Sequence, residues 1–475
     1  MKNKYMLIIL TRILTISKKW ILIRNNQMEK WIIKVNLSIW EVNKINLNKI
    51  ESISLKNKII SNKYKVFNMK HKRRQSDVKE EVLKTSEKEL HIGNNINLNE
   101  TYARDIFKSI LDKAIIKNAS DIHIEPFKEY ILVRLRVDGF LVEDRKLEYE
   151  VYQQLLVVIK LDTFMNITEK RLPQDGRLAI DIKDQVIDIR ASTLPTVYGE
   201  KIVLRILNRK SFLKRKEELG FSKKAIDKIE SIINKKSGIL LVTGSTGSGK
   251  TTTVYSIIND LKCTSKNIVT IEDPVEYKIE GVNQIQVNNK VGLSFESGLR
   301  SILRQDPDII IVGEIRDIET AKIAIKAATT GHLVISTIHT KDAVSAISRL
   351  LDMEIPQYLI SASLIGIISQ KLIRKVCTTC ITQKEENELN QINENPMNRE
   401  CEECDGLGYK GRTAIYEILE IDNDIRKDIQ NMQDYNTIKE TAIKNGMITF
   451  EESAKNLIDN NITTEEEYIS LEIGI

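Results

Sequence analysis

The sequence predicts an α/β protein whose main domain holds a parallel β-sheet covered on both faces by helices. Three observations predict this fold. Short apolar runs with the length of buried strands recur between residues 238 and 337. Segments with helical spacing of apolar residues alternate with those runs, as in parallel sheets with crossover helices. Glycines, carboxylates and histidines follow the runs, at the strand ends where open α/β sheets hold their ligands.

Length and composition allow several domains. The 475 residues correspond to two to four domains at roughly 100 to 200 residues each. With 41% hydrophobic and 29% charged residues, the chain has the composition of a soluble protein. Its net charge of +6 is unevenly distributed, because residues 1–74 hold 18 lysines and arginines against 3 acidic residues. Residues 75–475 are therefore mildly acidic.

The first 74 residues contain no glycine or proline and are predicted to be a basic stretch that forms no folded domain. Their longest apolar run, Tyr5 to Leu10, is far shorter than the roughly 18 residues that a membrane span requires. An arm attracted to anionic lipid or nucleic acid is the alternative interpretation, and translation could also begin at Met69. Residues 75–100 are polar and are predicted to be a linker.

Residues 101–210 are predicted to form a smaller α/β domain. The alternation of apolar and polar residues in its strands places Arg190 and Arg205 on polar faces. Arg171 and Arg177 add to the basic character of this domain. The predicted elements are helices over Thr101–Asn118 and Glu148–Phe164, and strands over Tyr130–Asp138, Val186–Ala191 and Lys201–Leu207.

A glycine-rich motif lies between the apolar run Gly238–Val242 and a predicted helix over Lys250–Leu261. A phosphate-binding loop needs this strand–turn–helix order, because the turn exposes backbone N–H groups and the helix N-terminus adds partial positive charge. We expect Lys250 to reach the β- and γ-phosphates of ATP and Thr251 to ligate Mg²⁺. A chance glycine-rich turn is the alternative. The predicted nucleotide-binding residues here are Gly244, Ser245, Thr246, Gly247, Ser248, Gly249, Lys250, Thr251 and Thr252.

Two further apolar runs end in acidic residues. The first is followed by Glu272 and Asp273, which we expect at the nucleotide because they lie at the carboxyl end of a strand. The second is followed by Gly313, where the usual Walker B pattern has a magnesium-binding aspartate. Glu314 is therefore the acid at that strand tip, and we predict that it orients or deprotonates the attacking water. A glutamate that caps the next helix is the alternative.

Another apolar run begins at His332 and leads to His339, in a chain with five histidines. We predict that both histidines sense the γ-phosphate or hydrogen-bond across a subunit boundary, and a packed core histidine is the alternative for each. Strands that alternate with helices make residues 211–372 a RecA-like core. Its predicted strands include Ile268–Ile271, Ile309–Val312 and His332–Thr337, and its predicted helices include Phe295–Arg304, Ile318–Thr329 and Ala343–Leu351.

Arginines in both predicted domains could act on the nucleotide. An arginine placed against the γ-phosphate stabilises transition-state charge, and such a residue can come from another subunit. We predict catalytic roles for Arg190 and Arg205, although surface arginines are more often simply solvated. Arg300 and Arg304 lie one helical turn apart and could contact nucleotide or an acidic neighbour.

Four cysteines have the spacing of a zinc site. Two Cys-x2-Cys pairs are separated by 20 residues, which predicts a four-thiolate structural Zn²⁺ site with no open position for catalysis. Disulfides are the alternative, and the remaining cysteine, Cys263, is expected to be a buried free thiol. Residues 373–415 are thus a predicted zinc-binding insertion, and residues 416–475 a helical C-terminal region. The predicted zinc ligands are Cys377, Cys380, Cys401 and Cys404.

These motifs, in this order, resemble the secretion ATPases that drive type II secretion and type IV pilus assembly. The resemblance runs from about residue 101 to 415. Small departures are Ser245, where the family usually has proline, and Lys371, where arginine is common; the family's first N-terminal domain is not recognisable in residues 1–100. The matching stretches are Ala119–Pro126, Arg136–Gly139, Arg171–Arg177, Gly244–Thr253, Ile271–Tyr277, Leu299–Asp317 and Gly331–Thr340.

The resemblance implies a hexameric ring at the cytoplasmic face of the inner membrane, with ATP between the two α/β domains. It also implies an inner-membrane platform protein as partner, no direct nucleic-acid contact, and assembly of a pilus or secretion pseudopilus. Retraction motors resemble this family but lack the zinc cysteines, which favours assembly. A competence-pilus ATPase for DNA uptake and a nucleotide-gated scaffold with little turnover are the alternatives. A nucleic-acid translocase is supported mainly by the basic stretch.

Overall fold

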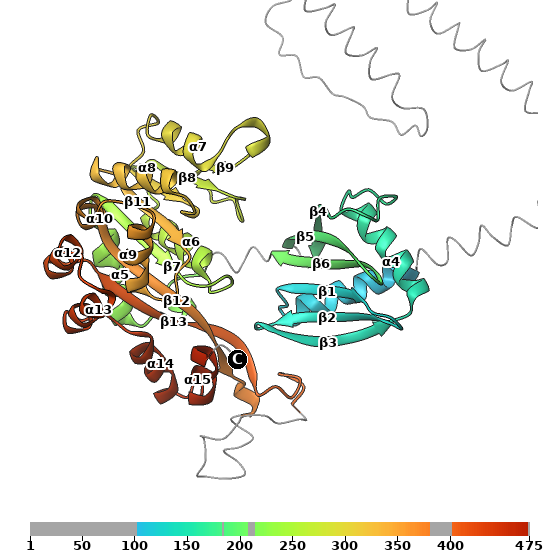
Figure 1. The fold of residues 1–475 in the computed structure, drawn as a ribbon. Coiled ribbons are helices and arrows are strands. Elements are labelled where there is room, and N and C mark those ends of the chain that lie inside the picture. Colours follow the sequence, from blue (N-terminus) through green and yellow to red (C-terminus); the bar gives the residue numbers. More distant parts are fainter. Residues whose placement is uncertain (1–101, 183–184, 208–213, 381–400, 474–475) are drawn as a thin grey trace, which may run out of the picture. The chain divides into compact units, whose positions relative to one another are not determined.

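The computed structural model describes residues 102–182, 185–207, 214–380 and 401–473 (Figure 1). The predicted basic stretch and linker, residues 1–100, lie outside the described residues. Those that are described form two α/β domains, residues 102–207 and 214–473, each with its own hydrophobic core. No helix in the described ranges combines the length and hydropathy that a bilayer span requires.

The first domain is a six-stranded antiparallel sheet in the order β3-β2-β1-β6-β5-β4. The helix over residues 102–116 and α4 cover one face, because Phe107, Ile110 and Leu155 share a core with alternate strand residues such as Ile122 and Leu204. The predicted smaller α/β domain is confirmed. Its strands and second helix are β1 (Asp121–Pro126), β2 (Ile131–Val137), β3 (Phe140–Leu147), α4 (Tyr149–Asp162), β4 (Gln174–Ile182), β5 (Gln185–Thr196) and β6 (Gly199–Leu207).

The second domain contains a seven-stranded sheet in the order β13-β12-β7-β11-β10-β8-β9. All neighbours pair in parallel except β12 and β13. The strands are β7 (Gly238–Thr243), β8 (Ile268–Glu272), β9 (Asn283–Gln286), β10 (Ile309–Val312), β11 (Leu333–Ile338), β12 (Leu364–Val376) and β13 (Tyr409–Glu420).

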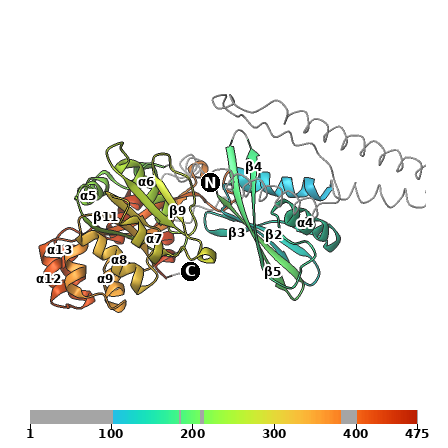
Figure 2. The ribbon, with the colours of Figure 1, turned by 90° about the horizontal axis from the view of Figure 1, so that it is seen from above.

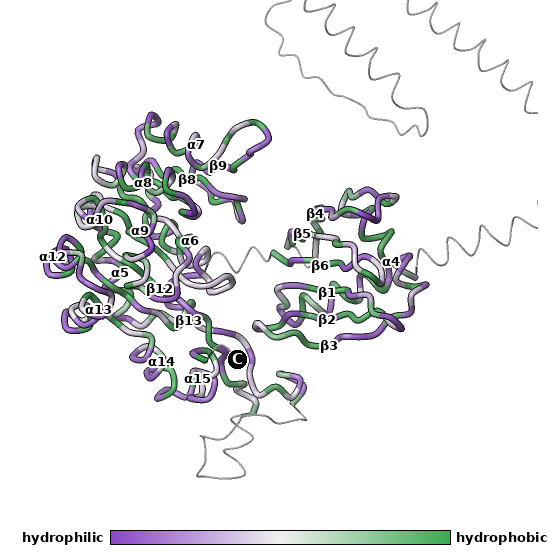
Figure 3. Tube along the Cα trace, viewed as in Figure 1, coloured by the Kyte–Doolittle hydropathy of each residue, from purple (hydrophilic) through white to green (hydrophobic). Residues whose placement is uncertain are grey.

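Helices cover both faces of this sheet. In Figure 2, α5 and α6 lie on one side of β11, and α8 and α9 lie on the other. The central strands are buried on both faces and consist mainly of hydrophobic residues, which Figure 3 colours green. The helices are α5 (Lys223–Ile233), α6 (Lys250–Leu261), α7 (Phe295–Ile302), α8 (Ile318–Thr329), α9 (Ala343–Asp352), α10 (Gln357–Ser363), α12 (Asn423–Gln430), α13 (Tyr435–Lys444), α14 (Phe450–Asp459) and α15 (Glu465–Ile473).

The RecA-like core is confirmed, and the predicted α6 and α8 agree with the structure at both ends. The C-terminal region differs from the prediction. Residues 416–420 were expected to be helical but belong to β13, because Tyr416, Ile418 and Leu419 are buried against helices on both faces of the sheet. The helical region therefore begins at α12.

Candidate nucleotide and zinc sites

The glycine-rich loop connects β7 to α6 as predicted. The φ angles of Gly244, Gly247 and Gly249 are positive, at 145°, 79° and 89° respectively, and residues that have a Cβ atom rarely adopt such values. A Cβ on Gly244 would also lie 2.3 Å from the carbonyl oxygen of Gln370 on β12. Glycine is therefore required here both for the turn and for the close approach of a neighbouring strand.

The loop holds its lysine tightly. Lys250 Nζ donates to the carbonyl oxygens of Gly244 at 2.9 Å and Ser245 at 2.8 Å. Burial lowers the pKa of Lys250, and the charge of Glu314 opposes that shift. Ser245, Thr246 and Gly247 are exposed, so that their backbone can meet a ligand; Thr251 is also exposed, in the first turn of α6, where a Mg²⁺ ligand is expected.

Glu314 lies just after the carboxyl end of β10, close to an arginine and a histidine. Its carboxylate is 13% exposed and lies 2.6 Å from Arg316 Nη2 and 3.7 Å from His339 Nε2. The hydrogen bond that Arg316 donates to Glu314 raises the pKa of Arg316. Burial lowers the pKa of His339, with a smaller contribution from the charge of Lys250. The structure thus brings Lys250, Glu314 and His339 together at the carboxyl ends of β7, β10 and β11.

The glycine before Glu314 has a packing reason. A Cβ at Gly313 would lie 3.2 Å from Glu272 Cα and from the Ile271 carbonyl oxygen on β8. The Gly313 amide donates to that same carbonyl at 2.8 Å. Close pairing with β8 leaves little room for the aspartate of the usual Walker B pattern, and Glu314 is the next residue that can point into the site.

The two acidic residues at the carboxyl end of β8, Glu272 within the strand and Asp273 just after it, have different surroundings. Asp273 is exposed, and its charge acts on Arg316. Glu272 is 5% exposed and accepts hydrogen bonds from Tyr255, Thr270 and Gln284. The prediction that both carboxylates contact the nucleotide therefore fits the position of Asp273 better than that of Glu272.

His332 lies at the amino end of β11, at the opposite end of the strand from His339. It precedes β11, whereas His339 follows it, and a strand of this length separates the two by about 20 Å. The His332 ring nitrogen Nδ1 lies 2.9 Å from the carbonyl oxygen of Ala327, at the end of α8. Parallel strands direct only their carboxyl ends toward the glycine-rich loop, so His332 lies away from the loop of its own chain. Its contact with nucleotide or across a subunit boundary stays a prediction.

A row of charged residues crosses the face of the first sheet opposite its helices. Cross-strand pairing aligns Arg177 with Arg190, Arg190 with Arg205, Arg205 with Asp121, and Asp121 with Arg136. Directly opposed residues share a face, so these side chains form one continuous row. Arg205 Nε donates to Asp121 at 3.0 Å. The catalytic roles of Arg190 and Arg205 stay predictions.

Arg300 and Arg304 are engaged locally on α7 and just after it. Arg300 donates to Glu296 one turn earlier, and Arg304 donates to the Arg300 carbonyl and the Ser301 hydroxyl. Both are exposed. Arg300 thus contacts an acidic neighbour on its own helix, and a nucleotide contact of either arginine stays a prediction.

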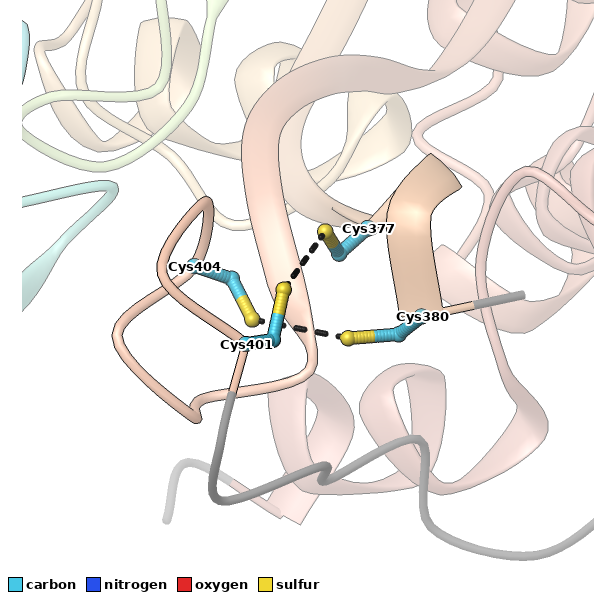
Figure 4. Close-up of side chains that lie close together, drawn as sticks. All are labelled: Cys377, Cys380, Cys401 and Cys404. Atoms are coloured by element: carbon cyan, nitrogen blue, oxygen red, sulfur yellow. Dashed lines mark hydrogen bonds between the residues drawn. The ribbon is translucent and has the colours of Figure 1, made fainter. Parts of the chain in front are cut away.

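The four predicted zinc cysteines converge between β12 and β13 (Figure 4). All four are buried, and their Sγ atoms lie within 4.8 Å of one another. The Sγ–Sγ separations are 3.9 Å for Cys377 and Cys401 and 3.6 Å for Cys380 and Cys404. Tetrahedral Zn²⁺ with Zn–S near 2.3 Å requires about 3.8 Å, whereas a disulfide requires about 2.05 Å. The thiols are free, and their geometry fits a structural zinc ion.

Cys263 was expected to be buried but is exposed. It follows the C-terminus of α6, beyond the last residue of that helix that enters the core. A hydrogen bond with Ser265 lowers its pKa.

Four polar residues outside the predicted set form hydrogen bonds beside the glycine-rich loop. The Thr340 amide donates to Thr243 Oγ1 at 2.9 Å, which joins the ends of β11 and β7. Thr253 Oγ1 donates to Gln370 Oε1 at 2.6 Å, which joins α6 to β12. In the sequence, the only sign of this contact is that Gln370 interrupts the apolar run that forms β12. The order of the strands in the sheet is needed to identify Thr253 as its partner.

Comparisons with known proteins agree on the family. A family model described as Type II/IV secretion system protein matches residues 98–470. The type IV pilus assembly ATPase PilB of Thermus thermophilus is 44% identical over 406 residues, covering 83% of this chain and 46% of PilB. This chain thus spans under half the length of that relative. The type II secretion system protein HxcR of Pseudomonas aeruginosa is 42% identical over 364 residues, covering 77% of this chain and 76% of HxcR.

Solved structures support the fold. The ATPase DotB of Legionella pneumophila has a TM-score of 0.60 at 23% identity, covering 78% of this chain and 96% of DotB. At that identity the likeness concerns the fold alone.

Proposed function

This chain belongs to the type II/IV secretion system protein family, and on that premise we propose that it hydrolyses ATP to ADP and phosphate to drive filament assembly. The single observation that carries the proposal is the convergence of Lys250, Glu314 and His339 at the carboxyl ends of neighbouring parallel strands. Relatives named as a type IV pilus assembly ATPase and as type II secretion system proteins support it.

The residues divide the chemistry among them. Backbone N–H groups of the glycine-rich loop and the Lys250 ammonium bind the phosphates. Glu314, held by Arg316 and facing His339, orients the attacking water and accepts its proton. Thr251 would hold Mg²⁺, which neutralises charge on the phosphate oxygens when bound.

The larger setting is also a proposal. We place the protein as a hexamer at the cytoplasmic face of the inner membrane, where it acts on a platform protein of a pilus or secretion apparatus. Arg190 and Arg205 complete the nucleotide site, and zinc is structural. The zinc cysteines are the feature of this chain that favours assembly over retraction.

The test compares steady-state ATP hydrolysis and ATP binding of the parent chain with Lys250→Ala and Glu314→Gln. We expect Lys250→Ala to lose ATP binding, because the cation that meets the phosphates is gone. Glu314→Gln should bind ATP yet turn over about 1,000-fold more slowly, since general-base catalysis contributes on the order of 10²–10⁴. Particle mass measured with ATP should correspond to six subunits.

Glu319→Gln is a matched control, because Glu319 pairs with Lys322 on the surface of α8. It should hydrolyse ATP at the parent rate. Hydrolysis by Glu314→Gln at the parent rate would overturn the role of Glu314. Tight ATP binding without turnover in the parent, even with membranes added, would favour a nucleotide-gated scaffold instead.

A further inference from the structure

Tyr255 connects the helix after the glycine-rich loop to the segment that follows β8. It lies on α6, and its side chain is 2% exposed. Its phenol donates to Glu272 Oε2 at 2.5 Å and accepts from the backbone amide of Glu276 at 3.3 Å. One hydroxyl group therefore holds both ends of the segment 272–276, which turns at the edge of the nucleotide site.

The Glu272 carboxylate accepts hydrogen bonds from groups of the same domain. Thr270 Oγ1 donates to Glu272 Oε1 at 2.5 Å and Gln284 Nε2 donates to the same oxygen at 3.2 Å, while Tyr255 takes the other oxygen. A buried carboxylate with three donors is satisfied where it stands. The carboxylate is thus committed to holding the segment, and the exposed acid of this segment is the next residue, Asp273.

The segment lies against the residue before Glu314, because a Cβ on Gly313 would be 3.2 Å from Glu272 Cα, and the segment also carries Asp273. The charge of Asp273 acts on Arg316, whose guanidinium bonds to Glu314 at 2.6 Å. Movement of the segment 272–276 would shift Asp273 relative to Arg316 and so disturb the orientation of the Glu314 carboxylate. Errors of about 1 Å in a positioned group can cost on the order of 10²-fold in rate.

We propose that Tyr255 is a positioning residue for ATP hydrolysis, acting with Glu272 to hold the segment 272–276 against α6. The inference deepens the proposed function and rests on it. The tyrosine ring fills the core together with Val254 and Ile258, so that phenylalanine would retain the packing. Only the hydroxyl makes the connection to Glu272 and Glu276.

The experiment uses the full chain with Tyr255→Phe and a matched control, Tyr416→Phe. Tyr416 is also buried in the same domain, and its hydroxyl also accepts a backbone amide hydrogen bond, from Ser222 at 2.9 Å. Both variants lose one buried hydroxyl, so a loss of stability alone affects both. For Tyr255→Phe we expect kcat for ATP to fall about 10-fold with KM changed less than about 2-fold, whereas Tyr416→Phe keeps the parent values.

Amide hydrogen exchange gives a readout that does not depend on hydrolysis. In Tyr255→Phe the amide of Glu276 should exchange faster, and in Tyr416→Phe it should exchange at the parent rate. If the parent itself does not hydrolyse ATP, the proposed function fails, and Glu276 exchange still decides whether Tyr255 holds the segment. Unchanged exchange in Tyr255→Phe, or a kcat equal to that of Tyr416→Phe, would overturn the inference.

Glu272→Gln separates the positioning role from nucleotide binding. If Glu272 acts through Tyr255, the double variant with Tyr255→Phe should be no slower than the slower single variant, because both changes break the same contact. If Glu272 instead binds the nucleotide or its metal, Glu272→Gln would raise KM for ATP or the Mg²⁺ requirement, and the two effects would multiply. That second result would contradict the inference.

Discussion

At the scale of single residues, Glu417 is a buried acid that accepts a hydrogen bond from the first turn of α9, a helix far from it in sequence. It lies on β13, 4% exposed, and accepts a hydrogen bond at 2.8 Å from the amide of Ala343 at the start of α9. Burial raises the pKa of Glu417, the charge of Asp342 adds to the shift, and the Ala343 amide opposes it. The negative charge therefore costs stability at neutral pH.

The pH dependence of Glu417→Gln tests this cost. When folding raises the pKa of an acid, the folded protein is most stable at pH values below the pKa that the acid has in the unfolded chain. That contribution to the free energy of unfolding is lost as the pH rises through the pKa that the acid has in the folded protein. The glutamine variant lacks that loss, so its melting temperature at pH 7 should exceed that of the parent by a few degrees. Below pH about 4, where Glu417 is protonated, the two should melt together. Thermal melts across this range provide the measurement.

Glu420→Gln is the matched control on the same strand, since Glu420 is partly exposed and pairs with Lys235 at 2.8 Å. Surface pairs contribute little, so this variant should melt at or slightly below the parent temperature at pH 7. A Glu417→Gln protein that is less stable than the parent at pH 7 would show that the ionised carboxylate stabilises α9.

At the scale of elements, the long hairpin of β12 and β13 links three parts of the second domain. Its base completes the central sheet, and Gln370 on β12 contacts α6 through Thr253. Its far end carries the four cysteines, with Cys377 directly after β12. Tyr409 opens β13 and pairs with Val376, so the thiolate cluster closes the hairpin where strand pairing ends.

Removing zinc should therefore destabilise the hairpin. Replacing Cys380 with serine leaves three thiolate ligands, and structural zinc sites need four. We expect the purified parent to hold a single zinc ion per chain and Cys380→Ser to hold less, with a lower melting temperature that added zinc does not restore. Metal analysis and thermal melts, with and without a chelator, provide the measurement.

Cys263→Ser is the control, because Cys263 is exposed and lies outside the cluster. Its zinc content and melting temperature should equal those of the parent. A parent without zinc whose cysteines are oxidised would contradict the zinc assignment.

At the scale of the whole molecule, the chain carries its phosphate-binding loop and its arginine row in different domains. Lys250 and Glu314 belong to the second domain, whereas Arg190 and Arg205 lie on the sheet of the first. An arginine that meets the γ-phosphate acts mainly on the transition state. The proposed function therefore requires the first domain for turnover rather than for nucleotide affinity.

Arg205→Ala tests the role of the row. We expect kcat to fall at least about 100-fold with little change in ATP affinity, by analogy with arginines that stabilise phosphoryl transfer. Arg104→Ala is the matched control, because Arg104 also pairs with an aspartate of the first domain, Asp162 at 3.2 Å. It should keep the parent kcat. Equal rates for the two variants would remove Arg205 from the catalytic machinery.

The sequence by itself determined the features that depend on neighbours along the chain. The glycine-rich loop was predictable because its glycines, its lysine and the flanking strand and helix are contiguous. Apolar spacing located α6 and α8 correctly at both ends. The four-cysteine cluster was predictable because only two residues separate the cysteines of each pair.

Only the tertiary structure decided which of the predicted polar residues meet one another. His332 and His339 flank the same strand, and its direction places only His339 beside Glu314. Glu272 is the last residue of β8, and its carboxylate is buried, where it accepts hydrogen bonds from Tyr255 and Gln284. Strand order and side-chain direction decide which residues far apart in the chain become hydrogen-bond partners. A local pattern in the sequence contains neither, so these partners could not be predicted from it.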